Sequence, residues 1–226
     1  MPAPISVIIP TLNSARNLPA CLGALSEALT VGLLTEVIFA DGGSSDDTEQ
    51  IADEVGAVFV SAPQGRGNQM AMAATIAKGE WLLFLHADSV FGKSWTNGVF
   101  KHLNDPEKAG YFKLRFDEPG LAAKLVAFWA NFRSRLFGLP YGDQGLLISQ
   151  RLYNRVGGYD SIPIMEDIAM AKKLRGDLMG IPIVVETSAE KYRKNGWLKR
   201  SFRNFSILLQ YFAGADPEKL AKKYYR

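Results

Sequence analysis

The sequence predicts an α/β fold in which helices cover both faces of a mostly parallel sheet. Across residues 5–103, short apolar runs alternate with segments of helical periodicity. That alternation is typical of parallel strands connected by helices. Two of the apolar runs also lead directly into a carboxylate, at Asp41 and at Asp88. Because open α/β sheets bind ligands at the carboxyl ends of their strands, these carboxylates predict a ligand site.

The first strand and the first helix have the clearest signals. Residues 5–10 form an apolar run that ends in proline, and they predict a buried strand. The helix after it carries apolar residues at one-turn spacing, which places them on one face. These residues are Leu18, Cys21, Leu22, Leu25 and Leu29. Cys21 is the single cysteine of the chain, so we expect a small buried side chain and no internal disulfide.

The other elements of the first half follow from apolar runs and capping residues. Strands are predicted over 36–40, 57–60 and 81–85. Ser44 and Ser45 are expected to cap a helix that ends at Gly56, and Ser94 to cap a short helix that ends near residue 103. An Ala- and Met-rich helix is predicted over 68–78.

The second half is less regular. Residues 111–116 alternate, which predicts a strand with Phe112, Leu114 and Phe116 on one face. The remaining predicted elements are strands 145–149 and 181–185, and helices 121–136, 151–156, 166–174 and one with an apolar stripe from Leu198 to Phe212. We expect one domain, 1–226, with a nucleotide-type half over about 1–105 and an acceptor-type half over about 106–226.

Composition excludes some classes of partner. Hydrophobic residues make up 47% and charged residues 22% of the chain, which is ordinary for a globular protein. A net charge of +3 is too small to indicate a nucleic-acid partner. The opening residues 1–5 lack the features of a signal peptide, and no apolar run approaches the roughly 20 residues of a spanning helix. We therefore expect a cytoplasmic protein.

Two segments after strands could bind a nucleotide and a metal. Asp41 precedes a glycine turn that contains Gly43, where a carboxylate can accept a hydrogen bond from a base or a ribose. A tight turn explains the serines after it but leaves Asp41 unexplained. His86 and Asp88 are separated by one residue of extended chain, so both can point to one Mn²⁺ or Mg²⁺ ion. A turn beside an internally bonded histidine is the alternative there, and we favour the metal.

Three further segments carry candidate groups. Arg66 lies between glycines at a helix start, where a diphosphate can bind, although an ordinary loop is the alternative. Glu166 and Asp167 are adjacent carboxylates at a helix start, so they either complement the helix dipole or include a general base. Residues that could contact an acceptor are Tyr141, Asp143, Gln144, Arg193 and Trp197, although Trp197 also suits the core.

Four ordered motifs resemble the family 2 glycosyltransferases, which have the GT-A fold, a Rossmann-like nucleotide-diphospho-sugar transferase architecture. They are Ile5-Ser6-Val7-Ile8-Ile9-Pro10-Thr11-Leu12-Asn13, Ala40-Asp41-Gly42-Gly43-Ser44-Ser45-Asp46-Asp47-Thr48, Gly79-Glu80-Trp81-Leu82-Leu83-Phe84-Leu85-His86-Ala87-Asp88, and Glu166-Asp167. The resemblance covers about residues 4 to 190. It implies an inverting transfer of a sugar from a nucleotide diphosphate, UDP more than GDP, to an acceptor hydroxyl of a small or lipid-linked molecule.

The resemblance also implies roles for single residues. Asp167 would be the general base beside Glu166, and Asp88 would bind a divalent metal that bridges the diphosphate. Residues implied at the nucleotide sugar are Pro10, Thr11, Asn13, Asp41, Gly43, Arg66, Ala87 and Asp88. The chain departs from the family's Asp-x-Asp motif at His86, which puts metal affinity and metal preference in doubt. It also lacks the Gln-x-x-Arg-Trp signature of the processive members, so a polysaccharide synthase is not expected.

Two other functions stay open at this point. A sugar-nucleotide nucleotidyltransferase shares the α/β pattern, but it needs a Gly-rich loop where this chain has Pro10 and Thr11. A non-catalytic nucleotide-sugar binder is compatible with His86, while Asp88 and Asp167 argue against it. Three segments also resemble a short bacterial subset of the family that is associated with radical-SAM gene neighbourhoods and arsenosugar biosynthesis. They are Gln64-Gly65-Arg66-Gly67-Asn68-Gln69-Met70, His86-Ala87-Asp88 and Tyr141-Gly142-Asp143-Gln144-Gly145.

The apolar stripe of the predicted helix 121–136 has more than one explanation. Phe128, Trp129 and Phe132 lie on one face, with basic residues elsewhere on the helix. Such a helix can lie on a membrane surface and meet a lipid-linked acceptor, or it can form a homodimer contact. Packing against the domain core is the commoner explanation, and it is the one that we expect.

Overall fold

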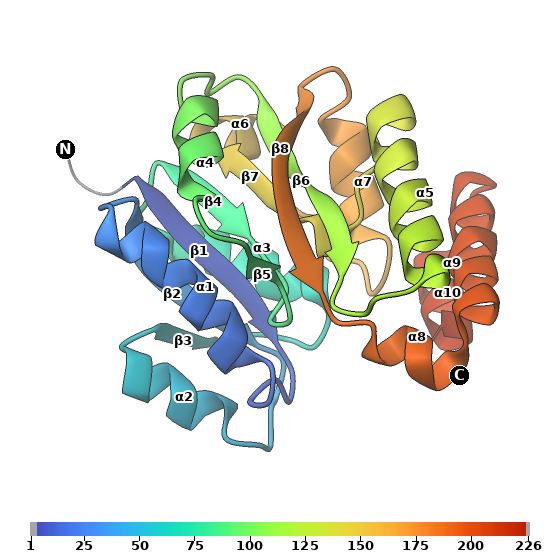
Figure 1. Cartoon of the computed structure of the whole chain (residues 1–226), viewed down its shortest axis with the longest axis horizontal. Helices are drawn as coiled ribbons and strands as arrows, with labels where there is room; N and C mark the ends of the chain where they lie inside the picture. Colours follow the sequence, from blue (N-terminus) through green and yellow to red (C-terminus); the bar gives the residue numbers. More distant parts are fainter. Residues whose placement is uncertain (1–3, 225–226) are drawn as a thin grey trace.

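The computed structural model describes residues 4–224, so the first three residues of the opening segment lie outside the described part. One eight-stranded sheet crosses both halves of the chain in the order β3-β2-β1-β4-β7-β6-β8-β5 (Figure 1). Its strands are β1 (Ile5–Thr11), β2 (Leu34–Asp41), β3 (Val58–Ser61), β4 (Trp81–Phe84), β5 (Val90–Phe91), β6 (Ala109–Phe116), β7 (Leu146–Ser149) and β8 (Leu178–Thr187).

The sheet is parallel in its first half and mixed in its second. Strands β3, β2, β1 and β4 are parallel to one another, as the alternating pattern of the sequence predicts. The direction changes at β7, which is antiparallel to both β4 and β6, and β5 is antiparallel to β8. The α/β class is therefore confirmed, with a more mixed sheet than expected.

Helices lie on both faces of this sheet (Figure 1). They are α1 (Leu18–Thr30), α2 (Thr48–Val55), α3 (Arg66–Ile76), α4 (Thr96–His102), α5 (Leu121–Phe137), α6 (Gln150–Arg155), α7 (Glu166–Lys173), α8 (Glu190–Asn195), α9 (Trp197–Phe212) and α10 (Pro217–Tyr224), with a 3₁₀ turn, η1, at Gly142–Gln144. Alternate side chains of β1 point to opposite faces, so Val7 and Ile9 pack beneath α1 while Ile8 packs beneath α3.

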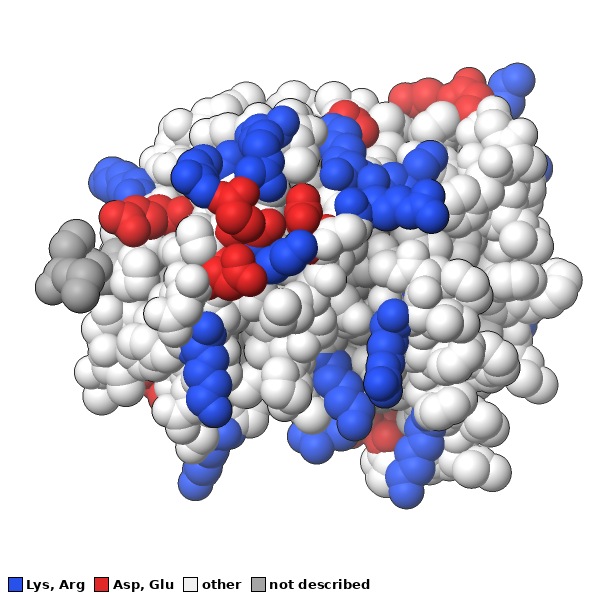
Figure 2. Space-filling model, turned by 90° about the horizontal axis from the view of Figure 1, so that it is seen from above, with Lys and Arg blue, Asp and Glu red and all other residues white. Residues whose placement is uncertain are grey.

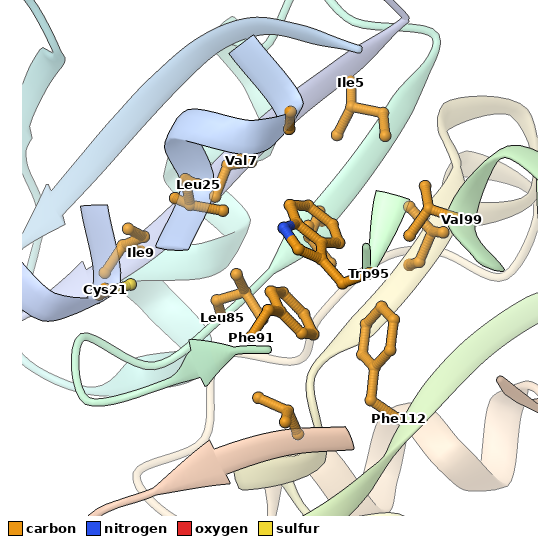
Figure 3. Packing of buried hydrophobic residues seen from close by; sticks show 14 of the residues in the cluster. Ile5, Val7, Ile9, Cys21, Leu25, Leu85, Phe91, Trp95, Val99 and Phe112 are labelled. Carbon is orange, nitrogen blue, oxygen red and sulfur yellow. The ribbon is translucent and has the colours of Figure 1, made fainter. Parts of the chain in front are cut away.

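Trp95 is the largest fully buried side chain of the α1 side of the core. It stacks on Phe91 with ring centroids 4.3 Å apart, and its indole nitrogen donates to the carbonyl of Ala24 over 3.0 Å. Figure 3 shows the ring among side chains of β1, α1, β5 and β6. Cys21 is buried in the same cluster, as expected, and burial raises the pKa of its thiol to about 12.

Replacing Trp95 with Ala is expected to lower the free energy of unfolding by about 3–5 kcal/mol, because it removes a large buried side chain and leaves a cavity. Urea unfolding followed by circular dichroism measures the change. Trp129→Ala is the matched control: Trp129 is 61% exposed, and its loss should change stability by less than about 0.5 kcal/mol. Equal effects of the two substitutions would contradict the prediction.

Two predicted helix caps are wrong, because other groups satisfy those backbone ends. Helix α2 begins at Thr48, whose backbone N–H donates to the carboxylate of Asp46, and Ser44 instead donates its hydroxyl to Asp41 over 2.6 Å. Ser94 does not cap α4. The carboxylate of Glu27 on α1 accepts hydrogen bonds from the backbone of Ser94 and from the backbone and hydroxyl of Thr96.

The expected packing of the α5 stripe is also wrong. The helix meets β6 through small residues, Ala123 and Ala127, and through Asn131, whose amide bonds both backbone groups of Leu114. Small side chains let the helix approach the sheet closely, so its large side chains face outward. The exposed residues of the stripe are Leu121, Leu125, Phe128, Trp129, Phe132 and Leu136.

No helix within residues 4–224 is both long enough and apolar enough to cross a bilayer.

Candidate active site

Two neighbouring cavities open at the carboxyl ends of β1 and β4. The large cavity has a volume of about 720 Å³, and the small cavity has a volume of about 120 Å³. Both are lined by Arg66, His86, Asp88, Pro163, Ser188 and Lys191. A ligand in the large cavity would therefore reach the groups of the small one.

Asp41 organises the turn beside the large cavity. Its carboxylate is buried at the end of β2 and accepts hydrogen bonds from the hydroxyls of Thr11 and Ser44 and from the backbone of Gly43 and Ser44, all within 2.8 Å. Burial alone raises the pKa of Asp41, but these hydrogen bonds outweigh it and hold the pKa below its usual value. Asp41 is thus an ionised anchor for the strand ends.

The turns after β1 and β2 are joined by side chains. Asn13, in the left-handed region at φ +49°, accepts from the backbone of Ser45 over 2.9 Å and lines the large cavity. The buried amide of Gln69 on α3 donates to the carbonyls of Thr11 and Ala40, both over 2.7 Å. These bonds fix the cavity wall that Thr11 and Asn13 form.

Arg66 contacts two groups from segments that are distant in the sequence. Its guanidinium lies 3.3 Å from Nε2 of His86 and 3.8 Å from a carboxylate oxygen of Glu166. Burial, together with the charges of Arg66 and Lys191, lowers the pKa of His86 well below its usual value. A neutral His86 can accept from Arg66, so this ring nitrogen is directed at a cation.

Glu166 and Asp167 begin α7 in different environments. Glu166 is buried, and burial raises its pKa to about 7, a shift that Arg66 opposes and Asp167 supports. Asp167 lines the small cavity and accepts from the backbone of Gly142 over 2.8 Å. Met165, directly before the pair, has φ +66°, a strained conformation of the kind that occurs at functional sites.

Replacing Glu166 with Gln is expected to flatten the dependence of stability on pH. Because the folded pKa is raised from about 4.5 to about 7, the folded state holds a proton that the unfolded chain has released. This contribution to stability is present below about pH 4.5 and is lost as the pH rises through about 7. Melting temperatures across that range should fall less in the variant. An unchanged slope would contradict the prediction, and the exposed Glu49→Gln is the control.

Two glycines allow the close contacts of this site. A Cβ atom on Gly67 would lie 2.3 Å from the carbonyl of Asp160, and one on Gly142 would lie 2.7 Å from Nε2 of His86. Any side chain at these positions would force backbone or the histidine to move. Gly67 therefore lets α3 approach the segment that carries Glu166, and Gly142 lets η1 approach His86.

The small cavity also contains buried polar atoms without a hydrogen-bond partner in the described residues. They are Oδ1 of Asp143, Nε of Arg200 and Oδ1 of Asn204. Burial raises the pKa of Asp143 to about 6, and Arg133 opposes that shift. Unpaired buried polar atoms are costly, so a polar ligand in this cavity would satisfy groups that the fold leaves unpaired.

The structure brings most of the predicted site residues together. Those that line one or both cavities are Pro10, Thr11, Asn13, Arg66, His86, Ala87, Asp88, Tyr141, Asp143, Glu166 and Asp167. Asp41 and Gly43 lie in the turn behind Thr11 and line neither cavity.

Three predicted acceptor residues lie away from both cavities. Gln144 is fully buried, and its amide bonds the hydroxyl of Ser134 and the carbonyl of Phe112, so it joins α5 to β6. Trp197 stacks on Tyr192, with centroids 4.7 Å apart, in the cluster beneath α5. Arg193 pairs with a glutamate at the surface.

Sequence reasoning missed several groups that line the small cavity, namely Lys191, Tyr192, Arg200, Asn204 and Tyr224. Arg200 and Asn204 are one turn apart on α9, opposite its apolar stripe. That polar side of an amphipathic helix is the signal that could have identified them.

The surroundings of Asp88 suit a divalent metal that is shared with a ligand. Mg²⁺ is commonly held by one or two carboxylates together with phosphate oxygens and waters, and Asp88 lines both cavities. Among the described residues, no group of three or more His, Cys, Asp or Glu side chains forms a metal cage. A metal here would therefore take most of its ligands from a bound diphosphate and water.

Two mycobacterial proteins resemble part of this chain in sequence. The PGL/p-HBAD biosynthesis glycosyltransferase of Mycobacterium tuberculosis is 42% identical over 96 residues, which cover 39% of this chain and 37% of that protein. The glucosyl-3-phosphoglycerate synthase of the same species is 32% identical over 95 residues, which cover 38% of this chain and 29% of that protein. The matches span well under half of these relatives.

Solved structures share the fold at low sequence identity. S. aureus TarS aligns with 91% of this chain and 40% of its own, with a TM-score of 0.61 and 16% identity. The M. tuberculosis glucosyl-3-phosphoglycerate synthase, solved with Mn²⁺, UDP and phosphoglyceric acid, aligns with 82% of this chain and 68% of its own, with a TM-score of 0.58 and 20% identity. At such identities the likeness concerns the fold alone.

The family assignment comes from the sequence match. The model of glycosyl transferase family 2 matches residues 6–141, which is more than half of the chain. That range begins in β1 and ends at Tyr141, so it includes the turn at Asp41, Arg66 and Asp88. The chain therefore belongs to glycosyl transferase family 2, and its mixed sheet with helices on both faces is the GT-A fold that the sequence predicted.

Proposed function

We propose that the protein is an inverting glycosyltransferase that moves a sugar from a nucleotide diphosphate to an acceptor hydroxyl. The observation that carries this proposal is the pair of joined cavities. Arg66 and Asp88 line both of them, and Asp167 lines the small one. A donor in the large cavity would thus present its sugar toward a carboxylate in the small cavity.

The large cavity is proposed to hold the nucleotide. Its wall includes Pro10, Thr11 and Asn13, and Asp41 holds Thr11 from behind. Contact of Asp41 with the base stays a prediction. Its oxygens already accept four hydrogen bonds in the turn, so a base would have to share them. UDP is the expected nucleotide, and support comes from the UDP and UDP-GlcNAc complexes of the solved structures that share the fold. Residues of about 1–105 would form the donor half.

Asp88 is proposed to hold a divalent metal together with the diphosphate. When bound, the metal would supply positive charge where negative charge develops on the leaving diphosphate. Arg66 and Lys191 lie in the same cavities and would stabilise that charge as well. The predicted role of His86 as a second ligand is less favoured, because its Nε2 lies 3.3 Å from the guanidinium of Arg66.

Asp167 is proposed to remove the proton from the acceptor hydroxyl. The backbone N–H groups of Gly142 and Ile168 donate to its two oxygens over 2.8 and 2.7 Å, and each carboxylate oxygen keeps a further lone pair for the acceptor hydroxyl. Glu166 would act as a positioning residue, because it contacts Arg66. Tyr141, Asp143, Arg200 and Asn204 would bind the acceptor in the half of the protein formed by about 106–226.

The sequence resemblance to a subset associated with arsenosugar biosynthesis stays a prediction, as do the cytoplasmic location and a homodimer.

Donor binding and turnover test the proposal separately. Thermal unfolding with UDP or GDP, each with Mn²⁺, Mg²⁺ or chelator, should show a metal-dependent stabilisation by one nucleotide. Incubation with UDP-sugars should then release UDP, and a nucleotidyltransferase would instead release pyrophosphate from UTP and a sugar phosphate. Stabilisation without UDP release from any of a panel of UDP-sugars and hydroxyl acceptors would favour the non-catalytic binder. No stabilisation by any combination would contradict the donor site.

A further inference from the structure

Two neighbouring helices at one end of the molecule expose rows of large apolar side chains. Helices α5 and α9 pack against each other at the right-hand end of Figure 1. We name their exposed apolar surface the α5–α9 face. It consists of Leu121, Leu125, Phe128, Trp129, Phe132, Leu136 and Phe137 on α5, and Leu198, Phe202, Phe205, Leu209 and Phe212 on α9.

The three most exposed large apolar side chains of the described residues all lie on this face. Leu121 is 75% exposed, Leu198 is 88% exposed and Phe202 is 75% exposed. Large contiguous apolar patches on soluble domains mark surfaces that bind a protein or a membrane. In Figure 2 the right-hand end of the molecule, where Figure 1 places α9, is mostly white, with one group of acidic and basic side chains at its upper edge.

The charges on the two helices of this face have one sign. Helices α5 and α9 contain no Asp or Glu, and their charged residues are all Lys or Arg. Lys124, Arg135 and Lys199 are exposed, whereas Arg133 lies over the ring of Tyr141. Apolar and aromatic residues next to cations are the composition of helices that lie in the headgroup region of an anionic bilayer.

We propose that the protein binds to the surface of an anionic lipid bilayer through the α5–α9 face. The aromatic and leucine side chains would enter the boundary between headgroups and acyl chains, and the Lys and Arg side chains would contact lipid phosphates. A second copy of the chain fits less well. In a two-fold dimer this face meets itself, so Lys and Arg would approach Lys and Arg with no carboxylate on either helix to pair with them.

Helix α9 contributes both to the α5–α9 face and to the wall of the small cavity. Arg200 and Asn204 line the small cavity from α9, while Phe202 and Phe205 of the same helix point to solvent. Docking would therefore bring the small cavity close to the membrane surface. The docking itself does not depend on the proposed function, because lipid binding is measurable without any substrate.

Co-sedimentation with vesicles tests the proposal on the full chain. Vesicles of phosphatidylcholine with phosphatidylglycerol should bind the protein, vesicles of phosphatidylcholine alone should bind less, and high salt should weaken the binding. The emission of Trp129 should shift to shorter wavelength on binding, and a Trp129→Phe variant identifies that signal.

A double variant and a matched control locate the surface. Trp129→Glu with Phe202→Glu should lower vesicle affinity at least about tenfold, because two large side chains no longer enter the bilayer. Leu29→Glu with Phe100→Glu changes two other exposed apolar residues, on α1 and α4, and should bind like the wild type. Circular dichroism and stabilisation by UDP check that both variants are folded.

Two results would overturn the proposal. One is no sedimentation with anionic vesicles at low salt, which rejects the bilayer as occupant. The other is a dimer in sedimentation velocity that the Trp129→Glu, Phe202→Glu variant converts to a monomer, with no vesicle binding by the wild type. That second result would assign the α5–α9 face to a second copy of the chain.

Discussion

Asp167→Asn is expected to lower the rate of sugar transfer at least about 100-fold and to leave nucleotide binding nearly unchanged. The amide can still accept the hydrogen bond from Gly142 that holds the carboxylate in the small cavity. It cannot take a proton from an acceptor hydroxyl, and general-base catalysis contributes typically about 10²–10⁴-fold. UDP release at saturating donor measures the rate, and thermal stabilisation by UDP with Mn²⁺ measures binding.

The neighbouring carboxylate provides the comparison for this experiment. Glu166→Gln should lower the rate less, because Glu166 faces Arg66 at 3.8 Å and has a pKa raised to about 7 by burial. Asp53→Asn changes an exposed carboxylate on α2, so turnover should match that of the wild type. If Glu166→Gln abolished transfer and Asp167→Asn did not, the roles of the two residues would be reversed.

Local patterns in the sequence were sufficient for the first half of the fold. The apolar run of residues 5–10 predicted a buried strand, and β1 is buried against a helix layer on each face in the structure. A buried strand followed by Asp88 predicted a carboxylate at the edge of the sheet, and Asp88 lines both cavities. These features depend on one segment at a time, which is why they can be predicted.

Contacts between distant segments could not be predicted in this way. Arg66 meets both His86 and Glu166, and Glu166 is 100 positions later in the chain, so only the packing of α3 against α7 brings them together. The sequence suggested His86 as a metal ligand because a contact between His86 and Arg66 cannot be recognised from the sequence alone. In the same way, Gln144 was expected near an acceptor but is bonded to Ser134 and Phe112 inside the fold.

Helix α5 shows why an apolar stripe does not by itself predict burial. Its large residues lie at the spacing of a core-facing helix, yet the helix packs on β6 through Ala123 and Ala127. The hydrophobic pattern identified an amphipathic helix correctly, but it contained two candidate contact faces. Which face meets the sheet depends on the space above β6, and that space is set by tertiary packing.

Asp88→Asn is expected to remove the metal dependence of donor binding and to lower transfer about 100-fold or more. Asp88 is the carboxylate at the junction of the two cavities, and a metal there would supply several kcal/mol of charge stabilisation at the leaving diphosphate. Titration of Mn²⁺ in the presence of UDP, followed by thermal unfolding, measures metal affinity without any turnover.

His86→Gln distinguishes the two candidate ligands at this position. Because Nε2 of His86 accepts from Arg66 over 3.3 Å, its loss should leave Mn²⁺ affinity near that of the wild type while it lowers kcat by displacing Arg66. An equal loss of Mn²⁺ affinity in both variants would show instead that His86 replaces the first carboxylate of the Asp-x-Asp motif as a ligand. Unchanged metal affinity in Asp88→Asn would contradict a metal site at Asp88. The negative charge on the leaving diphosphate would then be stabilised by Arg66 and Lys191.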